Sequence, residues 1–207
     1  MTMSLLEEYT RLYREVLRPV AVGLEGLIRD HLASTRRVDR VAARAKAPDP
    51  FIAKASKQEP DGSPKYVDPL VQIQDQIGAR IVVFYKPDVE TVSGIVKRYF
   101  RPIELQTIVP DSHWTFGYFG MHFILALPTE AVPAGIAVDR APQFFELQIK
   151  TLFEHAWSEA EHDLGYKPPE QLNGDQQRRL AYTAAQAWGA DRVFEELHKE
   201  VGAIGSV

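Results

Sequence analysis

Apolar residues recur along the chain with two different spacings, which predicts both helices and strands. From Leu5 to Leu17 they return every three or four positions, so a helix opens the chain. Pro19 should bend or restart this helix, and a second helical stretch should end near His31. Helical spacing returns at 48–57, 88–100 and 151–164. A long final helix begins near 174, with expected apolar contacts at Leu180, Ala184, Trp188, Val193 and Leu197.

The strand-like segments are shorter and lie between the helical ones. Apolar or alternating runs predict strands at 36–46, 78–85, 103–109, 121–127 and 143–150. Because strands and helices are mixed in order, we expect an α/β (α+β) fold with a single mixed β-sheet flanked by helices. We expect one compact domain, with N-terminal helices at 1–35, a core at 36–170 and a C-terminal helix at 171–207.

Composition narrows the class of protein. The 207 residues are 45% hydrophobic with a net charge of −4, which is ordinary for a globular domain with a substantial core. The absence of cysteine excludes disulfides and thiolate metal sites. The N-terminal segment lacks the apolar region of a signal peptide, and no apolar run approaches the roughly 18 residues of a membrane span. We therefore expect a cytoplasmic protein that does not enter a membrane.

Charge is unevenly distributed along the chain. Residues 31–65 hold eight basic and four acidic residues, whereas residues 145–207 hold eleven acidic and six basic ones. A basic segment in an acidic protein indicates a local anionic ligand. A solvated surface without a ligand is the alternative interpretation.

The strand predicted at 143–150 has one unusually polar face. Glu146, Gln148 and Lys150 share that face because side chains alternate along a strand. A carboxylate beside a cation and an amide suits metal binding or general-base chemistry. A half-exposed strand explains the same alternation without any chemistry.

Two further groups of residues suit a phosphate-bearing ligand. Asp75 precedes an apolar strand, and such a carboxylate can hold Mg²⁺, although it can also cap a turn. Arg44, Lys46 and Lys54 lie around the start of a predicted short helix, where cations suit phosphate. The chain has no G-x-x-x-x-G-K-[ST] motif, so this is not a P-loop, and a solvated basic turn remains the alternative.

Aromatic and histidine side chains mark two other places. In "GYFGMH", Tyr118 can stack on a base and His122 begins a strand, although packing in the core would also explain these residues. His155 and Glu159 lie four residues apart on a predicted helix. That spacing can bind a metal, but a solvated helix face is the simpler interpretation.

The order of these motifs is more specific than any one of them. Residues 40–170 carry, in sequence, R-x-K with a further Lys eight residues on, D-x-x-G-x-R, G-Y-x-x-x-H, E-x-Q-I-K-T and A-W-x-x-x-E-H-x-x-x-Y-K. This series resembles the synthetase domain of the RelA/SpoT family, which makes the stringent-response alarmones ppGpp and pppGpp. The flanking helices suit the small single-domain alarmone synthetases or their toxic relatives. The resemblance implies a nucleotidyltransferase-like fold with helical N- and C-terminal extensions.

The resemblance also implies a reaction and a cofactor. The family transfers the β,γ-pyrophosphate of ATP to the 3′-hydroxyl of GDP or GTP. Asp75 and Glu146 match its Mg²⁺ ligands, and Glu146 matches the acid thought to take the proton from that hydroxyl. Such transfer depends on positioning and on charge neutralisation more than on covalent chemistry.

The remaining matched positions divide between the two substrates. Arg44 and Arg80 match the arginines that sandwich adenine, and Lys46 and Lys54 match positions that hold the ATP phosphates. The acceptor-side positions are Tyr118, which matches the aromatic that stacks on the acceptor base, and His122, Gln148, Lys150 and His155.

The chain departs from the family pattern mainly on the acceptor side. Phe119 and Gly120 replace the usual Arg-Ser, and His155 replaces an Asp or Asn. The segment before the tyrosine offers only His113 where basic residues hold acceptor phosphates in the family. In the first basic block, Pro50 stands where the family often has Ser.

Three functions therefore remain open. The first is a GTP diphosphokinase with GDP or GTP as acceptor. The second uses the same chemistry on adenine nucleotides or on the 3′ end of tRNA, as a toxin that an antitoxin protein would control. The third is a catalytically silent nucleotide-binding module. The amphipathic terminal helices also permit a homo-oligomer.

Overall fold

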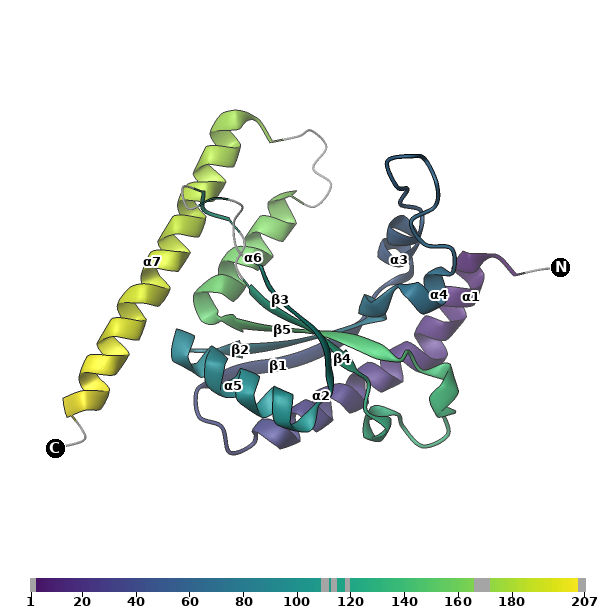
Figure 1. Cartoon of the computed structure of the whole chain (residues 1–207), viewed down its shortest axis with the longest axis horizontal. Coiled ribbons are helices and arrows are strands. Elements are labelled where there is room, and N and C mark those ends of the chain that lie inside the picture. The colour runs from purple at the N-terminus through teal and green to yellow at the C-terminus, as the bar shows by residue number, and fades with distance from the viewer. Residues whose placement is uncertain (1–2, 109–111, 113–114, 118–119, 166–171, 205–207) are drawn as a thin grey trace.

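A computed structural model of the chain describes residues 3–108, 112, 115–117, 120–165 and 172–204. One five-stranded sheet forms its centre, with the strands in the order β1-β2-β5-β4-β3 (Figure 1). The strands are β1 (Val38–Ala45), β2 (Ile77–Val83), β3 (Pro102–Ile108), β4 (Gly120–Ala126) and β5 (Phe144–Thr151). β2 and β5 are parallel and the other pairs are antiparallel. The expected mixed sheet flanked by helices is confirmed.

Seven α-helices accompany the sheet in the described residues. They are α1 (Leu5–Leu12), α2 (Arg18–Leu32), α3 (Pro48–Ala55), α4 (Pro69–Gln72), α5 (Lys86–Tyr99), α6 (Leu152–Gly165) and α7 (Gly174–Ile204). Short 3₁₀ turns lie at Gln74–Gln76 (η2), Thr129–Ala131 (η3) and Val138–Arg140 (η4). The sequence pattern missed α4 and η2, since four-residue and three-residue turns are too short for a hydrophobic period.

The first two helices run on without interruption across Pro19. A π-helical turn at Tyr13–Leu17 joins α1 to α2, immediately before the proline. Proline has no N–H to donate to the carbonyl four residues back, and the wider turn accommodates that loss. The expected restart is therefore a local widening of one long helix.

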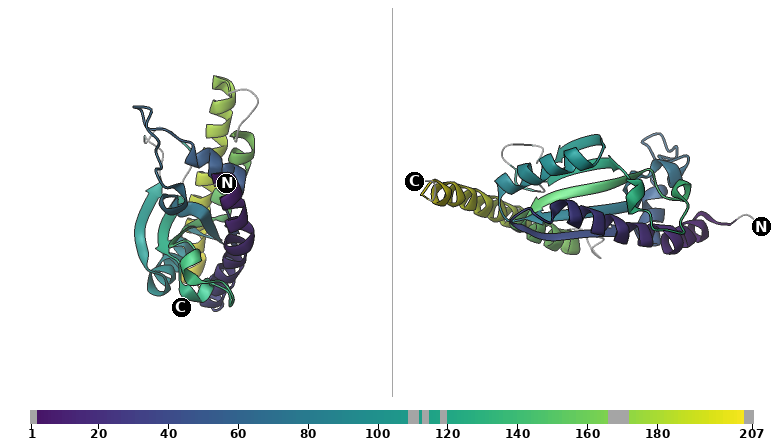
Figure 2. Two further views of the ribbon diagram at one scale, coloured as in Figure 1. Left: turned by 90° about the vertical axis from the view of Figure 1, so that its right-hand side faces the viewer. Right: turned by 90° about the horizontal axis from the view of Figure 1, so that it is seen from below.

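The two faces of the sheet differ in polarity. The side chains of Ile81, Phe123 and Leu147 point to one face, where they are fully buried in a single core with residues of α2 and α5. The sheet lies between this layer and α6, which packs on the opposite, polar face near the ends of β2 and β5 (Figure 2). α6 meets the sheet at β2 and β5, and the candidate site lies on this polar face.

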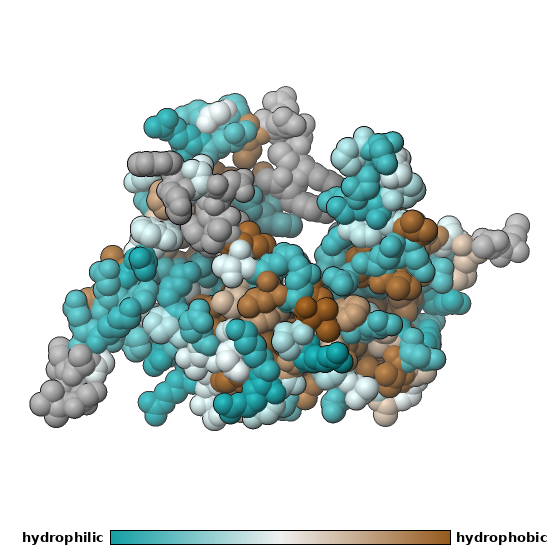
Figure 3. Space-filling view, in the orientation of Figure 1, coloured by the Kyte–Doolittle hydropathy of each residue, from teal (hydrophilic) through white to brown (hydrophobic). Residues whose placement is uncertain are grey.

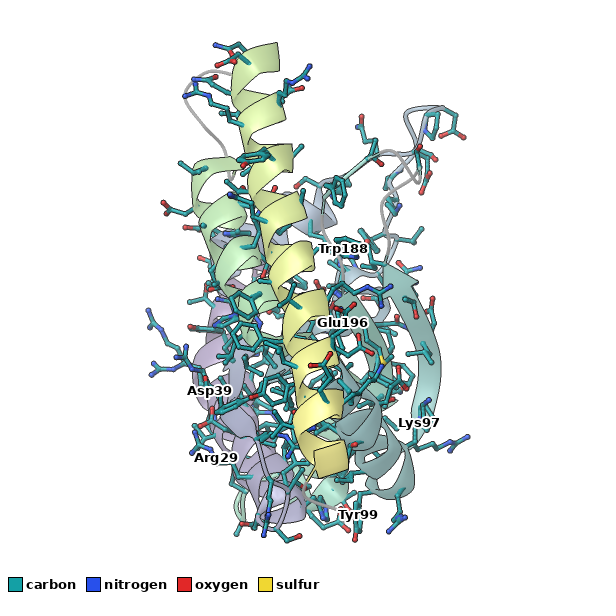
Figure 4. The ribbon with its side chains drawn as sticks, turned by 90° about the vertical axis from the view of Figure 1, so that its left-hand side faces the viewer. Arg29, Asp39, Lys97, Tyr99, Trp188 and Glu196 are labelled. Atoms are coloured by element: carbon teal, nitrogen blue, oxygen red, sulfur yellow. The ribbon has the colours of Figure 1, made fainter. Side chains whose placement is uncertain are left out.

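The long helix α7 stands at one end of the molecule, across from α1 at the other (Figure 1). In Figure 4 it crosses in front of the sheet, with Arg29 and Asp39 on one side and Lys97 and Tyr99 on the other. Ala184 is buried as expected, but Val193 and Leu197 are about half exposed. The inward face of α7 continues instead through the buried Asp191 and through Phe194, which stacks on Phe153, so the predicted contacts at Val193 and Leu197 are wrong.

The visible surface follows the same division. Figure 3 shows hydrophilic residues over α7 and over the segment near 57–65, with hydrophobic ones gathered between them. Across the part of the chain that the structure describes, no helix has both the length and the apolar character needed to cross a bilayer.

Candidate active site

Strand register brings the predicted site residues onto one face of the sheet. Arg44 of β1 lies opposite Gly78 of β2, which in turn lies opposite Glu146 of β5. The next row along the strands reads Ala42, Arg80, Gln148, His122 and Gln106 across all five strands. Directly opposed residues project to the same side of a sheet, so the polar side chains of these rows lie on one face.

Asp75 lies at the edge of this surface between two lysines. It belongs to the η2 turn that leads into β2, while Lys46 follows β1 and Lys54 lies on α3. The Nζ atoms of Lys46 and Lys54 lie 3.0 and 2.9 Å from the two carboxylate oxygens. Burial acts to raise the pKa of Asp75, but the two ammonium groups outweigh it, and the pKa lies below its ordinary value. Asp75 is therefore an ionised carboxylate.

Glu146 is held by its neighbours on the sheet. His122 Nδ1 lies 2.7 Å from Glu146 Oε1, and Gln148 Nε2 donates to the same oxygen at 3.3 Å. Burial acts to raise the pKa of Glu146, but the contact with His122 and the Gln148 hydrogen bond lower it overall. Because the carboxylate is ionised and can only accept, His122 donates through Nδ1.

The two carboxylates fit a magnesium ion. They are close enough for the charge of Asp75 to act on the pKa of Glu146. In the described residues no group of three or more His, Asp or Glu side chains could hold a metal. Mg²⁺ does not need such a group, because it is commonly bound by one or two carboxylates together with waters and substrate phosphates.

Arg80 is anchored by α6. Its Nη1 contacts a carboxylate oxygen of Glu159 and lies 3.2 Å from Nδ1 of His155. His155 and Glu159 therefore meet an arginine in place of a metal, while the Glu159 side chain stays 54% exposed, so this face of α6 is partly solvated as expected. Arg44 is exposed on the neighbouring strand and projects from the same face of the sheet. The motifs placed Arg80 in the site but gave no sign of its partner Glu159.

Lys150 is the most buried of the predicted site residues. Its side chain is 2% exposed, and its Nζ donates to Ser158 Oγ at 2.9 Å. Burial and then the charge of Arg80 lower the pKa of Lys150 to about 8. This position supports the junction of β5 with α6, and acceptor contact by Lys150 stays a prediction.

Two polar atoms on the row through β2 and β5 remain without partners. Arg80 Nε and Gln148 Oε1 are buried and have no hydrogen-bond partner in the described part of the chain. A donor and an acceptor on directly opposed residues indicate a place where a polar ligand or ordered water completes the hydrogen bonds. Tyr118, Phe119 and His113 lie outside the described residues, so their predicted roles stay predictions.

The arrangement combines three kinds of chemistry on one surface. Lys46 and Lys54 supply positive charge for phosphates, and Asp75 and Glu146 supply carboxylates for a metal ion and a proton. Arg44 and Arg80 supply flat cations that can stack on a base. Such a surface can bind a nucleoside triphosphate and activate a hydroxyl beside it.

Comparisons with known proteins show the family of the chain and the fold that it shares. Bacillus subtilis GTP pyrophosphokinase YjbM is 24% identical over 196 residues, which cover 91% of this chain and 86% of that protein. The structure is similar to small alarmone synthetase 1 from B. subtilis, with a TM-score of 0.72 and 22% identity over 95% of this chain and 97% of that one. A GTP pyrophosphokinase family protein from Streptococcus pneumoniae has a TM-score of 0.71 and 22% identity, covering 96% of each chain. A family model described as the region found in RelA / SpoT proteins matches residues 43–171, and the chain therefore belongs to the RelA/SpoT family.

Proposed function

We propose that this chain is a pyrophosphokinase that transfers the β,γ-pyrophosphate of ATP to the 3′-hydroxyl of GDP or GTP. The observation that carries the proposal is the placement of two ionised carboxylates, Asp75 and Glu146, beside the lysine pair and the arginine-bearing strands. Membership of the RelA/SpoT family and the likeness to YjbM, a GTP pyrophosphokinase, support the same reaction class.

On the donor side, we assign the ATP phosphates to Lys46 and Lys54 and the adenine to Arg44 and Arg80. The two lysines already converge on one carboxylate, so their ammonium groups are directed to a common point. Asp75 and Glu146 would hold Mg²⁺, which when bound neutralises phosphate charge. The lysines then add to that neutralisation at the triphosphate.

In the proposed reaction, the acceptor 3′-oxygen forms a bond to the β-phosphorus of ATP. The bond from that phosphorus to the α,β-bridging oxygen breaks, and AMP leaves. The proton of the hydroxyl goes to Glu146, whose carboxylate is held in place by His122 and Gln148. The fixed carboxylate orients the hydroxyl before reaction, which is where positioning lowers the barrier.

A second acceptor class is favoured by one observation. The polar face of β3 and β4 offers Glu104, Gln106 and His122, and neither strand contains Lys or Arg. This part of the sheet does not supply the cations that would bind the 5′-phosphates of GDP or GTP. An adenine nucleotide or the 3′ end of tRNA, with its phosphates bound elsewhere, is therefore the alternative acceptor. Control by an antitoxin belongs to that alternative and stays a prediction.

The deciding experiment follows labelled pyrophosphate. Purified protein with Mg²⁺ and ATP labelled at the γ-phosphate would be incubated separately with GDP, GTP, AMP, ADP and deacylated tRNA, and without an added acceptor. AMP release with label on GDP or GTP is the expected result. Label only on adenine nucleotides or tRNA would move the protein to the second acceptor class. Binding of ATP without AMP release under any condition would indicate the silent nucleotide-binding module.

A further inference from the structure

We propose that His155 and Glu159 of α6 are positioning residues that fix the guanidinium of Arg80 for stacking on the adenine of ATP. The inference rests on the proposed function and assigns these residues to the donor side. The motif comparison, in contrast, placed His155 on the acceptor side and gave Glu159 no role.

The contacts place the two α6 side chains on the same nitrogen of Arg80. Glu159 accepts from Nη1, and Nδ1 of His155 lies 3.2 Å from the same atom. His155 and Glu159 lie four residues apart, which is one turn of a helix, so both reach the sheet from one face of α6. Anchoring at Nη1 leaves the flat faces of the guanidinium and its second terminal nitrogen uncommitted to α6.

The chemistry of arginine fixes the protonation of His155 in this contact. A guanidinium has only N–H donors, so Nδ1 of His155 must accept and its proton must be on Nε2. The neutral imidazole and the ionised Glu159 then form a matched pair of acceptors for one donor group. Two acceptors on one terminal nitrogen restrain the guanidinium more than either acceptor alone.

Anchoring Arg80 has a consequence for ATP binding. A free arginine side chain loses considerable rotamer freedom when it is ordered, and an anchored one has lost that freedom before the ligand arrives. The aliphatic stem of Arg80 is already enclosed, as its side chain is only 23% exposed. The anchor should therefore improve ATP affinity while leaving the chemical step largely unchanged.

The charges around His155 make the anchor sensitive to pH. Arg80 from β2, Arg40 from β1 and Lys150 from β5 oppose protonation of His155, while Glu159 from α6 favours it. Burial and these cations keep its pKa below the ordinary histidine value. As pH falls through that lowered pKa, Nδ1 gains a proton, loses its role as acceptor and places a second cation beside Arg80. The KM for ATP should rise in acid for this reason.

The test compares KM and kcat for ATP among wild type, Glu159→Gln, His155→Ala and His155→Gln. We expect Glu159→Gln and His155→Ala to raise the KM for ATP about three- to tenfold at about pH 8, with kcat changing less than about twofold. His155→Gln keeps an acceptor but does not titrate, so it should restore a near wild-type KM and remove its rise in acid. The KM for the acceptor should stay unchanged in all variants.

A matched control is Asp163→Asn, which removes one negative charge from an exposed position one turn further along α6. This variant should leave the KM for ATP unchanged. A fall in KM with Glu159→Gln would mean that Glu159 competes with ATP for Arg80, and would overturn the proposal. A rise in the acceptor KM with His155→Ala, without a rise in the ATP KM, would overturn it in favour of the acceptor side.

Arg80→Ala separates this proposal from the proposed function. One outcome would overturn the anchor and leave the proposed function standing. In it, Arg80→Ala still transfers pyrophosphate but has a strongly raised KM for ATP, while the α6 variants keep the wild-type KM. A double-mutant cycle between Arg80 and Glu159, measured on the free energy of unfolding, tests the contact itself and does not require activity. Zero coupling in that cycle would also overturn the proposal.

Discussion

Glu146 shows how a single residue takes its role from its neighbours. Its carboxylate lies on a strand that places it on the polar face, and His122 and Gln148 both donate to the same oxygen. The second oxygen is left for a metal ion or for the acceptor hydroxyl. A carboxylate that is ionised and directed in this way is ready to accept a proton without first losing one.

Replacing Glu146 with Gln should lower the rate of AMP release by about 10²–10⁴-fold, because the amide cannot take the hydroxyl proton. The amide keeps the shape of the side chain and can still accept from His122, so binding of a non-hydrolysable ATP analogue should persist. AMP release and calorimetric titration measure the two effects. Glu90→Gln, an exposed change on α5, serves as the control. Unchanged AMP release in Glu146→Gln would show that another group takes the proton.

Lys150 makes a second prediction, on stability. Its pKa is about 8 in the folded protein, below its ordinary value of 10.5. Between these two values the unfolded chain binds more protons than the folded one, so the free energy of unfolding should rise with pH in that window. Lys150→Met lacks this group. The free energy of unfolding of wild type should therefore rise relative to that of the variant, by at most about 1.4 kcal/mol per pH unit from about pH 8 to 10.5. Denaturant titrations at several pH values measure this difference. The same pH dependence of the free energy of unfolding in both proteins would contradict the prediction.

At the residue scale, the sequence predicted which face of a strand a residue occupies better than it predicted the partner that its side chain contacts. The period of two in β5 placed Glu146, Gln148 and Lys150 on one face, as the register confirms. It gave no sign that Lys150 is buried against Ser158, because burial on a polar face depends on the docking of α6. Glu159 was visible only through its helical spacing from His155. Its partner lies 79 residues away, and such a contact has no local signal.

At the level of elements, Thr151 at the junction of β5 with α6 makes hydrogen bonds to both α6 and α7. Thr151 Oγ1 accepts from the N–H of Glu154, and Glu154 accepts from the N–H of Thr151, so the two residues form a capping box. The same hydroxyl donates to Asp191 of α7 at 2.7 Å. One threonine therefore caps α6 and anchors α7 against it.

Asp191→Asn should stabilise the protein near neutral pH. Burial raises the pKa of Asp191 to about 6, from an ordinary value of 3.8. Between these values the folded protein binds more protons, so wild-type stability should fall as pH rises through the window. Asn keeps an acceptor for Thr151 without a charge. The free energy of unfolding of Asp191→Asn should therefore exceed that of wild type by about 1–2 kcal/mol at about pH 7.5, and the difference should vanish below about pH 4.

Thermal unfolding of wild type and Asp191→Asn across this pH range measures the difference. Glu200→Gln makes the corresponding change at an exposed position of α7 and should give no pH-dependent gain. A lower stability of Asp191→Asn at neutral pH would show that the carboxylate charge itself holds α7.

The elements also show where sequence patterns stop being informative. The strands and long helices were predicted because their apolar residues repeat over two or more turns or pleats. The prediction for α7 failed at Val193 and Leu197 because the helix turns Asp191 and Phe194 inward instead, with Asp191 bonded to Thr151 and Phe194 stacked on Phe153. The predicted hydrophobic period followed the wrong face here, since it cannot detect an inward hydrogen bond such as that of Asp191.

For the whole molecule, the distribution of charge bears on the choice of acceptor. The segment 31–65 has an excess of basic residues, which would suit tRNA. In the structure, however, Arg37, Arg40 and Lys65 lie within 4.0 Å of a carboxylate, and Lys46 and Lys54 belong to the proposed ATP site. Paired cations attract a polyanion less than free ones, and the net charge of −4 opposes its approach. This distribution of charge supports the proposal of a small nucleotide over tRNA as the acceptor.

We therefore expect acceptor binding to depend weakly on salt. A mononucleotide displaces few counterions, whereas tRNA releases many, and the slope of log affinity against log salt reports their number. Titrations of GDP and of deacylated tRNA between about 50 and 200 mM salt should give a shallow slope for GDP and weak tRNA binding that is lost over this range. Tight tRNA binding with a steep slope would show that the basic segment exchanges its internal partners for phosphates. In that case Arg36 and Lys57, two further cations of the segment, would be the first residues to replace. Their removal should reduce the slope of log affinity against log salt without affecting the ion pairs of Lys46 and Lys54 with Asp75.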